Sequence, residues 1–169
     1  GDGDPAHRSN HAVSMVFEPG STFKAVSAAG ALNRGLVNLK TEIWCRNGLW
    51  TFPGGPIKDH HPYGMLSVED VIAKSSNIGA ITLAQRIGQE PFYNLIRSFG
   101  FGTRTGITLP GESPGILHPL HKWRPNSMFY VPFGHEVAAT PLQVINATCA
   151  IANGGTLMMP HIIREIRAA

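Results

Sequence analysis

The chain has 169 residues, 43% of them hydrophobic and 15% charged, which excludes a disordered protein and allows one domain with one hydrophobic core. Its net charge is +3, but the basic residues are scattered and lack interleaved aromatic residues, so no nucleic-acid partner is expected. The sequence holds no run of about 18 apolar residues, and no membrane-spanning helix is therefore predicted.

The first part of the chain is predicted to hold one helix followed by turns. Residues 1–20 are expected to form a loop, with no signal peptide at its start. A helix is predicted from Ser21 through Leu32, with Gly35 as its stop. Residues 36–64 contain several Gly and Pro breakers, which leaves room for a short hairpin.

Three further helices are predicted along the middle of the chain. Residues 67–74 begin with the spacing of a capping box, a Ser followed three positions later by an Asp. Apolar residues then recur at helical spacing over residues 78–87. Pro91 suits the first turn of a helix over residues 92–99.

The last third is predicted to be rich in loops, with one long helix. Residues 100–139 lack periodicity, and Pro141 is expected to begin a helix that runs to about Ala152. Residues 156–159 and 162–166 resemble two short strands. A polar start and a strand-like end suggest a piece cut from a longer chain.

The two cysteines do not predict a disulfide framework. Cys149 lies in an apolar helical run and is predicted to be a small core residue. Cys45 lies in a loop-like stretch, and a bridge between the two thiols is left open.

Asp59, His60 and His61 are adjacent residues of types that bind metals. No further ligands follow at zinc-like spacing, so a solvated loop is the favoured interpretation. Neither a metal nor a cofactor is expected in this chain.

Ser21 and Lys24 form the first candidate catalytic pair. Residues three apart lie on one face of a helix, which brings the lysine amine within reach of the serine hydroxyl. A neutral amine can take the proton of a serine and make it a nucleophile, and N–H groups at a helix start can stabilise an oxyanion. Because Ser-x-x-Lys matches arise easily by chance, an ordinary helix with a solvated lysine is the alternative.

Ser75, Ser76 and Asn77 form the second candidate element, between two predicted helices. A hydroxyl at Ser75 can relay a proton to a leaving amine, and the amide of Asn77 can hold a substrate carbonyl and orient Lys24. A plain polar turn between helices is the alternative, since Ser and Asn fill such turns routinely.

Together, the two elements and the segments around them resemble the class B (monofunctional) penicillin-binding proteins. Ser-x-x-Lys followed by Ser-x-Asn is the order used by penicillin-binding proteins and serine β-lactamases. The resemblance runs from about residue 14 to residue 166 and favours the cell-division branch over the elongation branch. Its segments are 18–24 (EPGSTFK), 74–80 (KSSNIGA), 99–102 (FGFG), 105–112 (TGITLPGE), 134–143 (GHEVAATPLQ) and 150–155 (AIANGG).

The resemblance implies a role for each site residue. Ser21 would attack the D-Ala–D-Ala carbonyl of a peptidoglycan stem peptide, with Lys24 as general base. Ser75 would pass the proton to the leaving D-alanine, and Asn77 would position substrate and Lys24. Substrate binding is implied for Ser75, Asn77 and Gly134. An amine of a neighbouring strand would resolve the acyl-enzyme, and a β-lactam would acylate the same serine.

A third family motif, Lys-Thr-Gly or Lys-Ser-Gly, is absent from the sequence. Arg104-Thr105-Gly106 is rejected as a substitute, because it lies inside another family segment and comes too early in the chain. In relatives the motif binds the substrate carboxylate, and its strand supplies the second oxyanion N–H. We therefore expect a partial transpeptidase domain over residues 1–169, truncated at both ends. Little or no activity is expected, since losing one oxyanion donor costs about 10²–10³ in rate.

The implied fold is mainly α: the helical portion of the α/β fold of penicillin-binding proteins and serine β-lactamases, with most of the central antiparallel sheet absent. The implied ligands are peptidoglycan stem peptides and β-lactams. Division or elongation complex proteins would be partners of the full-length protein, which would be anchored in the cell membrane with this domain on the extracytoplasmic, periplasmic side.

Two alternatives to a transpeptidase stay open. A β-lactamase or β-lactam sensor shares the fold, but normally has shorter loops and lacks the segments at 105–112 and 134–143. A non-catalytic interaction module that keeps the helical subdomain is the other alternative.

Overall fold

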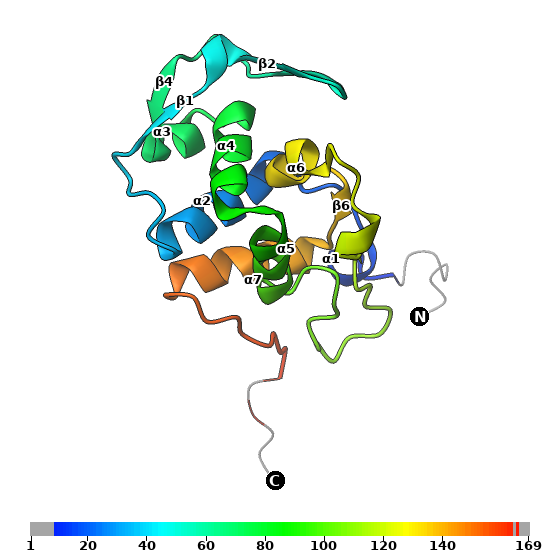
Figure 1. Ribbon diagram of the computed structural model, residues 1–169. Coiled ribbons are helices and arrows are strands. Elements are labelled where there is room, and N and C mark those ends of the chain that lie inside the picture. Colours follow the sequence, from blue (N-terminus) through cyan, green and yellow to red (C-terminus); the bar gives the residue numbers. More distant parts are fainter. Residues whose placement is uncertain (1–8, 164, 166–169) are drawn as a thin grey trace, which may run out of the picture.

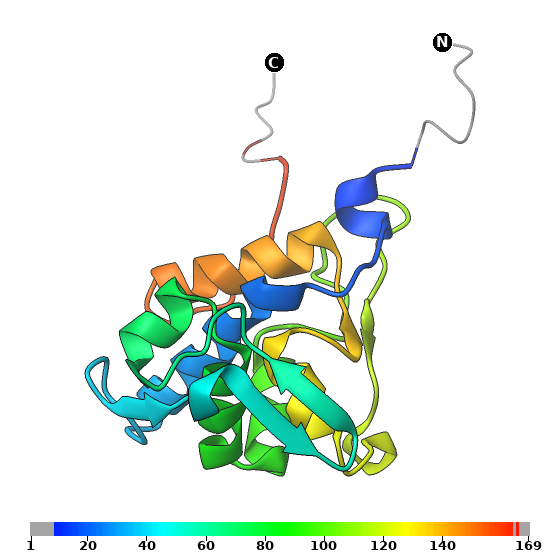
Figure 2. The same cartoon turned by 90° about the horizontal axis from the view of Figure 1, so that it is seen from above.

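A computed structural model describes residues 9–163 and 165, and the architecture is mainly helical (Figure 1). Helix α2 (Lys24–Asn33) lies between α7 (Pro141–Ala152) on one side and α4 (Asn77–Ile87) with α5 (Gln89–Ser98) on the other (Figure 2). The shorter helices are α1 (His11–Ser14), α3 (Val68–Ala73) and α6 (Ser127–Tyr130). Within the described part of the chain, no helix is long and apolar enough to cross a membrane.

Short 3-10 segments join several of these elements. They are η2 (Gly20–Phe23), η3 (Arg46–Gly48), η4 (Leu120–Lys122) and η5 (Val131–Phe133). The helix predicted from Ser21 is thus confirmed, with its first turn wound as η2 before α2 begins. The predicted helices over residues 78–87, 92–99 and 141–152 are confirmed as α4, α5 and α7, although α5 starts earlier than predicted.

The core lies where α2 and α4 pack against each other. Both helices bury small or branched side chains at helical spacing, among them Val26 and Ala31 of α2 and Ile81 of α4. Gly30 allows α2 to approach α5, because an added Cβ would overlap the side chain of Leu95. A close pair of helices therefore carries the segment that begins at Ser21.

Strands in the described residues form three separate two-stranded antiparallel sheets. They pair β1 (Glu42–Trp44) with β4 (Met65–Ser67), β2 (Leu49–Phe52) with β3 (Gly55–Lys58), and β5 (Ile116–Leu117) with β6 (Val137–Ala138). The predicted fold, mainly helical with little sheet, is confirmed.

The β2–β3 pair is the hairpin expected between residues 36 and 64, and it lies over α6 (Figure 2). Aromatic side chains fix it there: Phe52 stacks on Phe129 with ring centroids 4.1 Å apart, and Trp50 meets Phe129 edge-on at 5.3 Å. The hairpin ends at Lys58, so that Asp59 follows directly and lies beside the start of α4.

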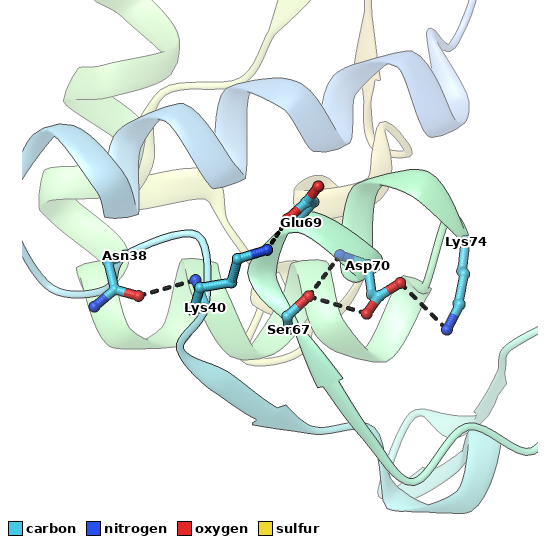
Figure 3. A network of polar contacts seen from close by, with 6 residues as sticks. All are labelled: Asn38, Lys40, Ser67, Glu69, Asp70 and Lys74. Atoms are coloured by element: carbon cyan, nitrogen blue, oxygen red, sulfur yellow. Dashed lines mark hydrogen bonds and ion pairs between the residues drawn. The ribbon is translucent and has the colours of Figure 1, made fainter.

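Helix α3 begins as the capping-box pattern predicted. The hydroxyl of Ser67 accepts the backbone N–H of Asp70 at 3.0 Å and donates to its carboxylate at 3.0 Å (Figure 3). Ion pairs of Lys40 with Glu69 and of Lys74 with Asp70 flank the cap, but they are exposed and contribute little to stability. This cap fixes where α3 starts, and α3 in turn leads to Ser75.

The strand predicted at residues 156–159 is wrong, because this segment has no regular secondary structure. The side chain of Asn153 instead binds the N–H and the carbonyl of Thr156, which folds the chain back into a turn after α7. Within the predicted strand at 162–166, residues 162, 163 and 165 are not in a strand, and residues 164 and 166 lie outside the described residues.

Cys149 is exposed, contrary to the prediction of a core residue. Helix α7 turns Gln143, Ala147 and Ala150 inward, and Cys149 lies on the outward face between them. Cys45 is buried, and both thiols are free.

Candidate active site

Ser21 and Lys24 meet at the start of the α2 segment. The side chain of Ser21 is exposed, whereas Lys24 is only 2% exposed. The Nζ atom of Lys24 donates a hydrogen bond of 3.1 Å to the Oγ atom of Ser21. Between them Phe23 is buried against Phe101, with ring centroids 5.0 Å apart, and this packing fixes which face of the helix the pair occupies. An accessible hydroxyl thus lies over a buried amine.

Ser75 reaches the same amine from the turn between α3 and α4. The Nζ atom of Lys24 donates to the Ser75 hydroxyl at 2.8 Å and to the Ser75 carbonyl at 2.6 Å. Ser75 has a φ of +55°, a left-handed conformation that residues other than glycine rarely adopt. Such backbone conformations cluster at active sites. The structure therefore brings three of the predicted site residues together around one nitrogen atom.

Burial changes the acidity of Lys24. Desolvation of the ammonium lowers the pKa of Lys24 to about 8, and the carboxylate of Asp59 opposes part of that decrease. A lysine with this pKa holds a far larger neutral fraction near neutral pH than an ordinary lysine does. The amine is therefore suited to accept a proton from the hydroxyl beside it.

Asn77 lies in the same turn, as the first residue of α4, but its amide faces elsewhere. Its Nδ2 atom donates to the carbonyl of Lys58 at 2.8 Å. Among the hydrogen bonds of the described residues, none joins Asn77 to Lys24. One side-chain N–H of Asn77 is thus bound to the carbonyl at the end of β3, and the role of Asn77 stays a prediction.

Asp59 is not among the site residues predicted from the sequence, yet it contacts the turn directly. Its carboxylate accepts from the Ser76 hydroxyl at 2.7 Å, the Asn77 N–H at 2.5 Å and the Ile78 N–H at 3.2 Å. The described residues contain no group of three His, Cys, Asp or Glu side chains that could hold a metal ion. No local pattern could reveal this contact, because Asp59 is distant in sequence from α4.

Gly134 lies against Gly20, the residue just before Ser21. The N–H of Gly20 donates to the carbonyl of Gly134 at 3.1 Å. Gly134 has a φ of +87°, and an added Cβ would overlap the backbone of Gly20. This approach of two backbones places Gly134 beside the nucleophile segment, and its role in substrate binding stays a prediction.

Glu18 ties the same two segments together. Its carboxylate accepts from the N–H of Glu136 at 3.0 Å and contacts the Nδ1 atom of His135 at 2.7 Å. The hydrogen bond from His135 holds the pKa of Glu18 below its usual value. A cavity of about 480 Å³ opens beside this contact and is lined in part by Glu18, Ser127 and Glu136, but Ser21 is not in its wall.

The tripeptide Arg104-Thr105-Gly106 makes hydrogen bonds within its own loop, to Glu112. The N–H of Thr105 donates to the carboxylate of Glu112 at 2.6 Å, and its hydroxyl donates to the same carboxylate at 2.5 Å. The guanidinium of Arg104 donates to the Glu112 carbonyl at 3.0 Å. These contacts support its rejection as a substitute for the missing third motif.

Known proteins are similar to this chain over nearly its whole length. Residues 2–168 match the family described as the penicillin binding protein transpeptidase domain. Penicillin-binding protein PbpB of Mycolicibacterium smegmatis is 40% identical over 158 residues, which cover 92% of this chain and 24% of that protein. The chain therefore spans about a quarter of the length of this curated relative.

Solved structures agree with the fold. The transpeptidase domain of Burkholderia pseudomallei penicillin-binding protein 3 has a TM-score of 0.89 and 32% identity, over 95% of this chain and 48% of that chain. Penicillin-binding protein 3 of Mycobacterium tuberculosis, complexed with ampicillin, has a TM-score of 0.87 and 35% identity, over 95% of this chain and 37% of that chain.

These similarities confirm the predicted family, and the relatives include cell-division class B proteins, the branch that the resemblance favoured. The chain is a homologue of peptidoglycan D,D-transpeptidase domains. It belongs to the penicillin-binding protein transpeptidase family.

Proposed function

We propose that this chain carries the acylation machinery of a peptidoglycan D,D-transpeptidase that acts in cell division. The observation that carries the proposal is the buried amine of Lys24, which lies 3.1 Å from the hydroxyl of Ser21 and 2.8 Å from that of Ser75. A nucleophile, a base and a proton relay are thus arranged in sequence around one nitrogen.

In the proposed reaction, neutral Lys24 takes the hydroxyl proton as the Oγ atom of Ser21 bonds to the carbonyl carbon between the two D-alanines. The resulting ammonium returns that proton through the Ser75 hydroxyl to the leaving nitrogen, and the C–N bond breaks. An ester on Ser21 remains. The amine of a neighbouring peptidoglycan strand then attacks the ester and forms the new amide. Its proton passes through the Ser75 hydroxyl and Lys24 to the Oγ atom of Ser21, which is released as the ester bond breaks.

Substrate binding is proposed for Ser75, Asn77 and Gly134. The amide of Asn77 spends one N–H on Lys58 and keeps its other N–H for a substrate carbonyl. Gly134 lies against Gly20, directly before the nucleophile, and would therefore border a substrate bound at Ser21. A β-lactam would acylate Ser21 by the same steps, and the ampicillin complex of the Mycobacterium tuberculosis relative supports this part of the proposal.

We further propose that acylation by this chain alone is slow. The sequence holds no Lys-Thr-Gly or Lys-Ser-Gly, so the second oxyanion donor and the carboxylate site of the family have no counterpart among its residues. One missing oxyanion donor costs about 10²–10³ in rate. Residues 1–169 would then be part of a transpeptidase domain whose full-length protein is anchored in the membrane, faces the extracytoplasmic side and assembles with division proteins.

Labelling with a fluorescent penicillin tests the proposal. We expect slow covalent labelling of the unchanged chain, none of Ser21→Ala, and unchanged labelling of the control Ser98→Ala, an exposed serine that binds its own helix. If the unchanged chain takes up no label during prolonged incubation, the assignment of Ser21 as the nucleophile is refuted. Stoichiometric labelling at the rate of a complete enzyme would refute the proposal that acylation by this chain alone is slow. Steady hydrolysis of a chromogenic cephalosporin would indicate a β-lactamase.

A further inference from the structure

We infer that Asp59 is a positioning residue for the Lys24–Ser75 pair. Its carboxylate holds the turn at residues 75–78 in the conformation that presents both Ser75 oxygens to Lys24. The inference rests on the proposed function, because it assigns Asp59 a part in the proton transfer proposed for that pair.

Three hydrogen bonds connect the Asp59 carboxylate to the turn. They come from the Ser76 hydroxyl at 2.7 Å, the Asn77 N–H at 2.5 Å and the Ile78 N–H at 3.2 Å. The first N–H groups of a helix have no acceptor within it, and a negative charge is favoured there. The Ser76 hydroxyl also accepts the N–H of Gly79 at 2.9 Å, so Asp59 orients the cap of α4 as well as its first turn.

The left-handed conformation of Ser75 makes this support necessary. Strained conformations persist only when the surrounding structure holds them on both sides. On the α3 side, the N–H groups of Ser75 and Ser76 donate to the carbonyls of Ile72 and Val71 at 3.1 and 2.9 Å. On the α4 side, the carboxylate of Asp59 supplies the restraint. Without it, the Ser75 carbonyl is free to turn away from the amine.

Asp59 is itself held in place by the hairpin. Its N–H donates to the carbonyl of Gly48 at 3.0 Å, and the preceding carbonyl, that of Lys58, accepts the side chain of Asn77. The β2–β3 hairpin therefore reaches the catalytic turn through adjacent residues. This explains how a segment that contributes no reacting group can still determine the geometry of the site.

Charge acts in the same direction as geometry. The field of Asp59 favours the ammonium form of Lys24 and so opposes the effect of burial on its pKa. The side chains that Lys24 and Ser76 contact besides Asp59 are uncharged: the hydroxyls of Ser21 and Ser75, and the thiol of Cys45, whose pKa burial raises. The charged side chains of Lys74 and Asp70 flank the turn at the end of α3 and pair with each other. Removing the Asp59 charge and releasing the Ser75 carbonyl would both disfavour the ammonium.

Competitive labelling of amines with acetic anhydride across a pH series measures the protonation of Lys24 directly on the whole chain. Mass spectrometry then gives a titration for Lys24, with the four other lysines as internal references. In Asp59→Asn we expect the titration of Lys24 to move to lower pH by about 0.5–1 unit, the size of one nearby charge. Asp59→Glu restores the charge and should return the titration toward that of the unchanged chain.

Asp70→Asn is the matched control, because Asp70 also accepts a serine hydroxyl at a helix start but belongs to the exposed cap of α3. It should leave the titration of Lys24 unchanged. A titration in Asp59→Asn equal to that of Asp70→Asn would overturn the inference. So would a rise toward the value of an ordinary lysine, which would mean that water had merely entered the site.

Two further measurements keep the inference separate from folding and from the proposed reaction. If Asp59→Asn does not fold, hydrogen exchange of the unchanged chain tests the inference instead. The backbone amides of Asn77 and Ile78 should be protected from exchange. Exchange of these amides as fast as in an unfolded chain would overturn the inference. Penicillin labelling should slow about 10-fold or more in Asp59→Asn and recover in part in Asp59→Glu. If even the unchanged chain takes no label, the proposed function fails, while the Lys24 titration still decides the role of Asp59.

Discussion

The amine of Lys24 lies 2.8 Å from the hydroxyl of Ser75, although 51 positions separate the two residues in sequence. The same amine lies 3.1 Å from the hydroxyl of Ser21, three positions before it. The local contact needs only one turn of helix, whereas the distant contact requires α3 and α4 to pack against α2. The site is thus complete around Lys24 only in the folded core.

The rate of Ser21 acylation should depend on pH through Lys24. Because burial lowers the pKa of Lys24 to about 8, the rate should rise as pH increases through that value and then level off as the amine becomes neutral. Stopped-time labelling with a fluorescent penicillin between pH 6 and 10 measures the profile. A rate that falls through this range, or rises only near the pKa of an ordinary lysine, would contradict the assignment of the base.

Replacing Lys24 by Met should abolish the base but keep the core. Met has a similar volume and removes a buried charge, so the melting temperature should not fall, whereas acylation should slow by about 10²–10⁴. Lys58→Met is the control, because Lys58 is exposed and contributes only its backbone carbonyl to the site. Equal labelling rates for the two variants would argue against a role for the Lys24 amine.

Gly134→Ala should destabilise the chain by pushing the backbone of Gly20 away. Gly154→Ala is a matched control, since its φ of +86° is close to the +87° of Gly134 but nothing lies within 4 Å of its added Cβ. Both variants strain the left-handed conformation, so their difference isolates the overlap, which we expect to cost about 1–3 kcal/mol. Urea denaturation measures that difference. Equal unfolding midpoints for the two variants would show that the backbone of Gly20 moves away from the added Cβ at little cost.

Gln143→Met should destabilise the chain, because Gln143 connects the start of α7 to the loops that precede it. The Gln143 side chain accepts from the N–H of Thr140 at 2.9 Å and donates to the carbonyls of Thr103 and Pro114 at 2.7 and 2.9 Å. Met leaves these buried groups unpaired, at a cost of about 2 kcal/mol or more. The exposed Gln85, also in a helix, supplies the control Gln85→Met, whose urea midpoint should stay near that of the unchanged chain.

Elements with local signals were predictable from the sequence. Helix α7 was predicted from Pro141 in its first turn, and the structure adds a complete capping box of Thr140 and Gln143 that the prediction did not use. Ser21 and Lys24 could be paired because three residues make nearly one turn of helix. In both cases, interactions between neighbours in sequence determine the geometry.

Features that depend on distant contacts could not be predicted in the same way. Asp59 looked like part of a solvated loop because its partners at the start of α4 are remote in sequence. Residues 156–159 have strand-like composition, but composition supplies no pairing strand. Cys149 was placed in the core by its apolar neighbours, whereas the face that α7 buries is set by its packing against the rest of the chain.

Ser21 is the residue that we propose becomes acylated. Tandem mass spectrometry of proteolytic peptides, after prolonged treatment of the chain with a penicillin, locates the adduct directly. We expect a mass increase of one penicillin on Ser21, acquired slowly by the unchanged chain and about 10²–10⁴ times more slowly when Lys24 is replaced by Met. An adduct on another residue, or on Ser21 at the same rate without the Lys24 amine, would contradict it.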